Sequence, residues 1–264
     1  MKEVKRYFRL YLASFKICLS REMIFRAHFL VDVMSELVWI SLSVLFLSVI
    51  YFHSGPIVGW RIEELVVLLG TSRIVSGLLG AFFHHIRGFS NLVNRGDLDF
   101  FLIRPASSQF LVSTQIFSLH GLVEAILGLI MILVALGRLG GLFSPSQFLL
   151  YLVFVAGGLL IAYSLWLISV LPVFWVGRLE NIHHLFLPFL QITRVPIGVF
   201  RGGLKMILTL VIPLAFMATI PAKVILGFLQ LSWLAGVFTL TTFFLFISSR
   251  LWNFALKRYS SASS

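Results

Sequence analysis

The sequence predicts an all-α integral membrane protein with six transmembrane helices, an N-terminal amphipathic interfacial helix, and a re-entrant outer hairpin before the last helix. Three observations predict this class. Hydrophobic residues make up 59% of the 264 residues. Charged residues make up only 12%, whereas soluble domains carry roughly 25%. Several apolar runs reach about 20 residues, the length that crosses a bilayer as a helix.

The first unit, 1–29, is predicted to be a basic amphipathic helix that lies in the membrane interface. Its apolar side chains recur at spacings of four and three residues, and its basic side chains fall mostly on the opposite face. The apolar set is Val4, Phe8, Tyr11, Phe15 and Cys18, and the basic set is Lys2, Lys5, Arg6, Arg9 and Lys16. Since Cys18 is the single cysteine, no intrachain disulfide is expected.

Four spans are predicted in the first two thirds of the chain, at 30–52, 63–85, 110–136 and 147–176. Glu63 and Glu64 open the second span, where a helix N-terminus favours negative charge. Asp32 and Glu36 lie near the inner start of the first span, so they are not expected to reach the bilayer centre. Pro172 is expected to kink or end the fourth span near the inner face.

The last third of the chain is interrupted by Gly and Pro residues. We interpret 181–200 as the fifth span, 201–223 as a re-entrant hairpin on the outer side, and 224–252 as the last span. Counting the hairpin as a seventh span would place the C-terminus, with Lys257 and Arg258, outside. With six spans most of the 21 Lys and Arg residues lie inside, so the positive-inside rule favours six spans and two cytoplasmic termini.

Charge gathers in the middle of the chain within 86–109, the loop predicted to join the second and third spans in the cytoplasm. Its central stretch, Asn94–Pro105, carries the charged residues Arg95, Asp97, Asp99 and Arg104. Gly96 suits the left-handed position that follows a helix C-terminus, and Pro105 stops helix propagation before the third span. Such a polar stretch is either a solvated inner loop or a docking surface for another protein.

Three charged residues fall inside the predicted spans: Arg73, Glu124 and Arg194. Each would cost about 2.5–3.5 kcal/mol if it faced lipid at mid-membrane. Arg73 and Glu124 are expected near mid-depth on consecutive helices, so they either form a helix-joining ion pair or line a substrate pathway. Arg194 has no opposite charge nearby in this layout, so it is the stronger candidate for a residue of the pathway.

The sequence contains no phosphate-binding loop, no dinucleotide-binding turn and no paired metal ligands. The histidine pairs His84–His85 and His183–His184 are interpreted as solvated interfacial residues rather than metal ligands. The net charge of +11 is explained by helix orientation and contact with anionic lipids, not by nucleic acid. We therefore expect no catalytic residue, no metal and no cofactor bound by this chain.

Together these features resemble the permease (membrane) subunits of ABC-2 type ATP-binding-cassette transporters, in their small six-span bacterial branch. The resemblance covers nearly the whole chain and rests on three features. They are the basic amphipathic N-terminal helix, the pattern G-x-L-D-x-x-L-x-R-P at Gly96–Pro105, and the proline-punctuated segments Ile212–Phe216 and Ile220–Ala222.

The resemblance implies an exporter in a bacterial cell (inner) membrane, built from a dimer of this permease with itself or with a related paralogue. It also implies separate ABC ATPase subunits, which bind ATP and Mg²⁺ and grip the loop after the second span, and a hairpin that closes the outer side. The expected ATPase contact comprises Arg95, Gly96, Asp97, Leu98, Asp99, Arg104 and Pro105. Arg104 is expected to pair with a carboxylate of the ATPase.

Two alternatives stay open on the sequence alone. A self-contained secondary transporter would need intramembrane carboxylates for ion coupling, and Glu124 is the only central one. A lipid-active intramembrane enzyme would need a polar site clustered at one depth, and the polar candidates are scattered. The 27 Phe residues suit a hydrophobic cargo and lipid-facing helices equally. The sequence therefore does not select among a drug, a peptide, a lipid and a glycan as substrate.

Overall fold

The computed structural model describes residues 11, 14–20, 26–140, 144–177 and 186–259, and helices form nearly all of this part of the chain. Five helices are long and apolar enough to cross a membrane. They are α2 (Arg26–Ser54), α3 (Ile62–Phe82), α7 (Leu119–Arg138), α8 (Pro145–Val170, continued by α9, Val173–Val176) and α13 (Leu231–Leu256). The all-α integral membrane class predicted from the sequence is confirmed.

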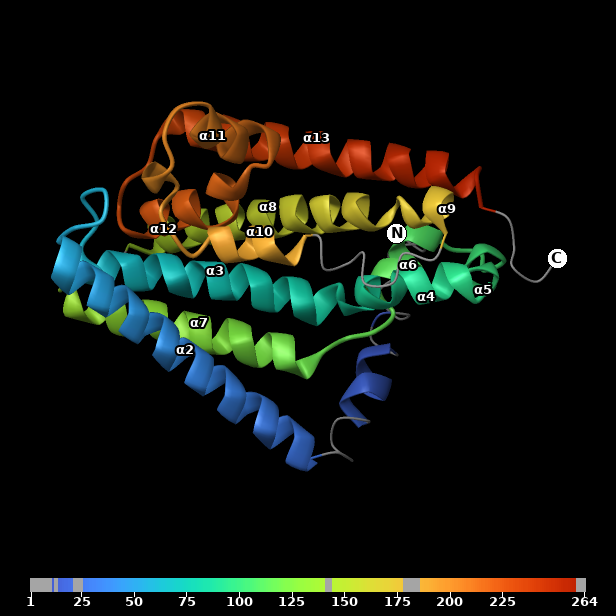
Figure 1. The fold of residues 1–264 in the computed structure, drawn as a ribbon, viewed down its shortest axis with the longest axis horizontal. Helices are drawn as coiled ribbons and strands as arrows, with labels where there is room; N and C mark the ends of the chain where they lie inside the picture. Colours follow the sequence, from blue (N-terminus) through green and yellow to red (C-terminus); the bar gives the residue numbers. More distant parts are fainter. Residues whose placement is uncertain (1–10, 12–13, 21–25, 141–143, 178–185, 260–264) are drawn as a thin grey trace.

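The bundle has two distinct ends (Figure 1). One end carries α4 (Phe89–Asn94), α5 (Asp99–Leu102), α6 (Ser108–Thr114) and the last turn of α13. The other end carries α11 (Gly202–Met206) and the 55–61 turn that joins α2 to α3. We call these the α5 end and the α11 end.

The N-terminal segment packs onto the helices at its apolar side chains. Residues 14–20 are helical, and the rest of the predicted 1–29 helix before residue 26 lies largely outside the described residues. Phe15 meets Phe117 edge-on at 4.7 Å between ring centroids, and Cys18 is buried beside Ala81. The apolar face predicted from the spacing therefore contacts protein in the segment that the structure describes.

The third span starts later than predicted. Residues 108–114 form the separate helix α6, and α7 begins only at Leu119 instead of 110. The break between them is stabilised from outside: the Phe117 backbone N–H donates to Cys18 Sγ at 3.4 Å, and the Ser118 N–H donates to the Ala81 carbonyl at 3.1 Å. Because these donors find partners elsewhere in the chain, the helix need not continue through the break.

The predicted fifth span, 181–200, is not a continuous helix in its described part. Only α10 (Leu187–Ile192) and the short 3₁₀ turn η3 (Ile197–Val199) form there, and 181–185 lie outside the described residues. Pro188 lies in the first turn of α10 and Pro196 follows its end, so the prolines leave room for one short helix.

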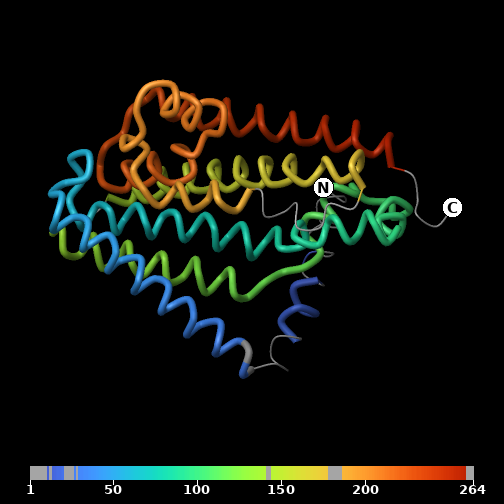
Figure 2. Tube along the Cα trace, in the orientation of Figure 1, coloured from blue at the N-terminus to red at the C-terminus, as the bar shows by residue number. Residues whose placement is uncertain are grey.

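A crossing nevertheless exists in this part of the chain. The α8–α9 helix ends at the α5 end and α13 begins at the α11 end, so the chain must return between them (Figures 1 and 2). Among the described residues, this return contains the short helix α10 and the turn η3.

The segment predicted as a hairpin, 201–223, is a bent pair of helical pieces at the α11 end. Its two arms, Gly202–Val211 and Ala215–Ile225, meet at 69° across the break that holds Pro213. They comprise α11, two π-helical turns, η4 (Ile207–Val211) and η5 (Ala215–Thr219), and α12 (Ile220–Ile225). Since α12 takes residues 220–225, the last span begins at Leu231 and not at the predicted 224.

Candidate functional site

The site is built on an unusually close contact between α3 and α7. A Cβ added to Gly77 would lie 2.5 Å from the Gly121 carbonyl oxygen, and one added to Gly70 would lie 2.6 Å from the Gly128 carbonyl oxygen. Each helix therefore places two glycines two turns apart on the same face, which lets the backbones touch. Arg73 lies between the glycines of α3, and Glu124 lies between those of α7, so the contact brings the two side chains together.

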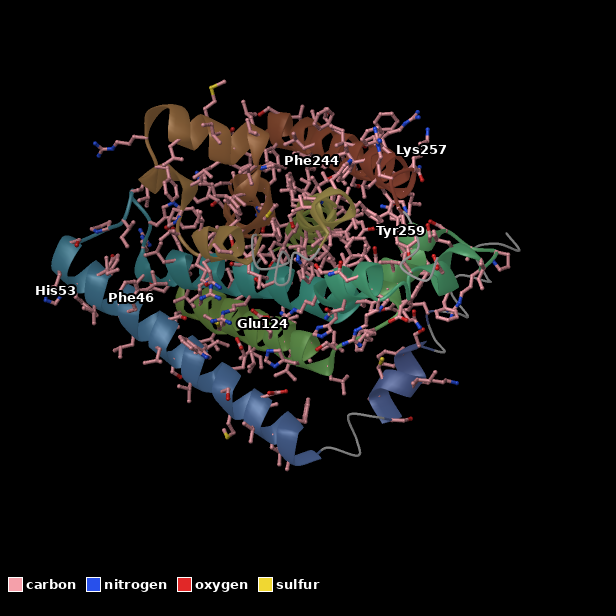
Figure 3. The ribbon with its side chains drawn as sticks, turned by 45° about the vertical axis from the view of Figure 1, so that its right-hand side comes forward. Phe46, His53, Glu124, Phe244, Lys257 and Tyr259 are labelled. Carbon is pink, nitrogen blue, oxygen red and sulfur yellow. The ribbon has the colours of Figure 1, made fainter. Side chains whose placement is uncertain are left out.

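Arg73 holds two carboxylates at once. Its Nη1 donates to Glu124 Oε1 at 3.3 Å and also to Glu36 Oε1. Arg73 is 3% exposed and Glu36 is 6% exposed, so the ion pairs are shielded from solvent. Figure 3 shows Glu124 on α7, within the membrane-spanning part of the bundle. The helix-joining ion pair expected from the sequence is present, and it links three helices rather than two.

Glu36 is the residue that the sequence reasoning missed. We expected it to stay near the inner start of its span, but α2 begins at Arg26 and places Glu36 about 15 Å along the helix axis. The helix has 29 residues, roughly 43 Å, which exceeds a hydrocarbon core of about 30 Å, and it runs at an angle to α3 and α7 (Figure 1). The signal available in the sequence was that Arg73 has two possible acidic partners in neighbouring spans, Glu36 and Glu124.

Arg194 lies beside this cluster, following α10. The preceding residue, Thr193, is buried, and its Oγ1 lies 2.6 Å from Ser72 Oγ on α3, the neighbour of Arg73. The return crossing is thereby joined to α3 at the level of the charge cluster. Arg194, predicted as a residue of the pathway, is thus brought to the same region as Arg73 and Glu124.

A cavity of about 200 Å³ opens between α3, α7, α8 and α10 at this level. Its polar lining includes Arg87, His120, Glu124, Gln191 and Arg194. Glu124 is the sixth residue of α7, about 7–8 Å from the start of that helix, so it lies nearer the α5 end than the mid-depth predicted for it. The cavity therefore runs from the charge cluster toward the α5 end.

The turn η1 (His84–Gly88) joins α3 to this end of the bundle. His85 is buried there, and its Nδ1 lies 2.8 Å from the Val112 carbonyl oxygen of α6. A carbonyl oxygen only accepts, so Nδ1 carries a proton and donates to Val112. Burial lowers the pKa of His85, and this hydrogen bond opposes the effect. The side chain of Arg87 is exposed, but partial desolvation by the surrounding protein lowers its pKa, and the negative charge of Glu124 opposes this effect.

The second group of predicted site residues, 95–105, forms a compact projection at the α5 end. Gly96 has φ of +78° after α4, the left-handed conformation that the sequence predicts there. Leu98 and Phe101 are buried and hold the segment on the bundle. Arg95, Phe100, Leu102, Ile103, Arg104 and Pro105 are exposed. The guanidinium of Arg104 lies 5.4 Å from the centroid of the Phe101 ring.

The histidine pairs could bind a metal only if they converged with other ligands, and this can be checked for the described part of the chain. Within it, no group of three or more His, Cys, Asp or Glu side chains converges as a metal site would require. His183 and His184 lie outside the described residues. The acidic side chains Glu36 and Glu124 pair instead with Arg73.

Five long apolar helices and a buried charge cluster around Arg73 define a multi-pass membrane protein. Comparison with known families identifies it further: residues 37–263 match the family described as ABC-2 family transporter protein, and the chain belongs to that family. It is thus a transmembrane permease of an ABC transporter. Searches among curated proteins and among solved structures returned no match.

The matched range, 37–263, contains both groups of predicted site residues. It begins one position after Glu36, so this partner of Arg73 lies just before it.

Proposed function

We propose that this chain is the membrane subunit of an ATP-driven exporter, that it works as a dimer with itself or a related paralogue, and that separate ABC ATPase subunits bind ATP and Mg²⁺ and drive it. Membership of the ABC-2 family supports an ABC ATPase partner in general. The sequence itself carries no phosphate-binding loop, so ATP hydrolysis has to come from another subunit.

The observation that carries the proposal is the projection at 95–105. It exposes Phe100 to 61% and Ile103 to 79%, while Leu98 and Phe101 anchor it with exposures of 0% and 6%. A rigidly anchored segment that presents apolar side chains next to arginine has the composition of a protein contact rather than of a solvated loop. The ATPase is proposed to bind here, with Arg104 pairing with one of its carboxylates.

The orientation follows from the same assignment. The α5 end faces the cytoplasm, the α11 end faces the outside, and both termini are cytoplasmic. The basic residues Arg250, Lys257 and Arg258 near the C-terminus agree with this orientation. The bent pair 202–225 then lies on the outer side, where it closes the pathway, and export moves substrate from the α5 end past Arg73, Glu124 and Arg194.

The test is Arg104→Ala, with Arg138→Ala as the matched control. Arg138 is exposed in the last turn of α7, at the α11 end. Purified ATPase subunit is titrated onto the permease in lipid nanodiscs, and the affinity and the permease-dependent ATP hydrolysis are measured. Loss of one charged hydrogen bond, about 1.5–3 kcal/mol, predicts an affinity at least about tenfold weaker for Arg104→Ala. Normal affinity together with normal ATP hydrolysis in Arg104→Ala would exclude the proposed contact.

The secondary-transporter alternative receives one observation from the structure, since Glu36 joins Glu124 as a second intramembrane carboxylate. Both carboxylates bind Arg73, which neutralises part of their charge and favours a structural role. Substrate movement in vesicles that contain the permease alone, driven by an ion gradient without ATP, would support the alternative over the ABC assignment.

A further inference from the structure

The charges around the 200 Å³ cavity do not balance. Arg73 is shared between Glu36 and Glu124, whereas Arg87 and Arg194 form no ion pair within the described part of the chain. The group of these three arginines and two glutamates therefore holds one more positive than negative charge. Arg194 is half-buried and Arg87 is exposed, and both line the cavity. The partly desolvated cation of Arg194 is therefore stabilised when an anion binds beside it.

Hydrogen-bond donors are also in excess. The indole Nε1–H of Trp166 is buried without an acceptor in the described structure, and Trp166 itself is 1% exposed and lines the cavity. An indole nitrogen can only donate. His120 Nδ1 is likewise buried without a partner in the described structure; His120 also lines the cavity, and this nitrogen donates in one tautomer of the ring. The guanidinium groups of Arg87 and Arg194 add further donors, so an oxygen-rich anion would satisfy what the protein leaves unpaired.

The apolar part of the lining comes from Leu79, Leu187 and Leu190. A volume of about 200 Å³ is below the 300–1,000 Å³ of pockets that take a whole drug-sized ligand. It suits a head group whose apolar tail lies elsewhere. Since the cavity runs toward the α5 end, it is reached from the side on which an exporter collects its cargo.

We propose that this cavity binds the phosphate group of an anionic amphipathic substrate, with Arg87, Arg194 and Trp166 as its ligands. The assignment of the ligand as transported cargo rests on the proposed export function, but binding itself does not. Phosphate offers several acceptor oxygens to guanidinium groups and carries the negative charge that the cluster lacks. Arg87 and Trp166 are thereby added to the residues expected along the pathway.

The test measures equilibrium binding of radiolabelled dioctanoyl phosphatidic acid to the full-length permease in detergent, without any ATPase. We expect saturable binding, and at least about tenfold weaker binding for Arg194→Gln and for Arg87→Gln, because each loses a charged hydrogen bond of about 1.5–3 kcal/mol. Arg138→Gln, at the opposite end of the bundle, should bind as the wild type does. Thermal unfolding of each variant verifies that the fold is intact. Because the two arginines lie on different elements, a single variant that still folds is enough to test the site.

Competitors separate the sources of the phosphate. Displacement by inorganic phosphate supports a site that recognises the phosphate group itself, and displacement only by unlabelled phosphatidic acid supports a site that also needs the acyl chains. Displacement by dioctanoylglycerol, which lacks phosphate, or undiminished binding in folded Arg87→Gln and Arg194→Gln would overturn the proposal. Arg104→Ala should bind phosphatidic acid normally, so failure of the ATPase contact and failure of the anion site are distinguishable.

Discussion

Helices α2 and α3 have similar hydropathy, but α2 is mostly exposed on the outside of the bundle and α3 is mostly buried within it. Their most apolar windows have mean hydropathies of 2.1 and 1.8, yet 11% of the window is buried in α2 and 72% in α3. Helix α2 diverges from the bundle toward the α5 end in both views (Figures 2 and 3), and Phe46 on it is 66% exposed. Helix α3 has Gly70 and Gly77 at its contact with α7, whereas α2 has no glycine. In lipid, small residues rather than hydropathy decide which helix is enclosed.

The strongest way to break this arrangement is Arg73→Leu, because Arg73 is the charged link between α3 and α2. The substitution leaves Glu36 and Glu124 buried without their cation, and removing one partner of a buried ion pair costs about 3–5 kcal/mol. We expect a large loss of folded permease, measured as the unfolding midpoint in a denaturing-detergent titration. The variant Arg73→Leu/Glu36→Gln/Glu124→Gln should recover much of the loss. A combined variant no more stable than Arg73→Leu would show that the ion pairs do not hold the helices together.

Gly77→Ala should destabilise the α3–α7 contact with a smaller but clear effect. The new methyl group would lie 2.5 Å from the Gly121 carbonyl oxygen, and overpacking of this kind costs about 1–3 kcal/mol. Gly80→Ala is the matched control on the same helix, because its Cβ would meet its nearest atom at 3.9 Å. The measurement is the thermal midpoint of the purified permease. Equal midpoints for the two variants would contradict the close contact.

Glu36→Gln should affect α2 alone and have the smallest effect of the three. The amide keeps the shape and can still accept from Arg73, so we expect a loss of about 0.5–1.5 kcal/mol, the size of an ordinary hydrogen bond. Hydrogen exchange of α2 should rise while that of α3 stays unchanged. Phe46→Ala on the lipid-facing side serves as the control and should change stability by less than about 0.5 kcal/mol. Faster exchange in α3 as well would mean that α2 is part of the enclosed core.

The sequence predicted most of the architecture because the long apolar runs leave few alternatives in a membrane. The class and the meeting of Arg73 with Glu124 both followed from hydropathy, charge and helix order. Gly96 was predicted to be left-handed because it suits the position after a helix C-terminus, and its φ of +78° agrees. The contact surface at 95–105 stays a prediction until an ATPase is tested against it.

What the sequence did not predict depends on contacts between distant segments. The start of α7 at Leu119 is set by backbone hydrogen bonds to Cys18 and Ala81, which lie far away in the chain. Glu36 was placed near an interface because the tilt of α2 is a property of the assembled bundle. Arg194 was thought isolated because its crossing was expected to be a regular helix, whereas prolines shorten that helix and Thr193 joins Ser72.

The interrupted return crossing has a consequence for how the chain enters the membrane during synthesis. Within the described residues this crossing comprises a helix of six residues followed by Arg194. This part is too short and too polar to partition into lipid by itself, since an arginine at mid-membrane costs about 2.5–3.5 kcal/mol on insertion scales. Its exposed backbone groups need protein around them. The earlier helices α3 and α8 must therefore already be in place to receive it, and the insertion machinery has to retain this segment until they are.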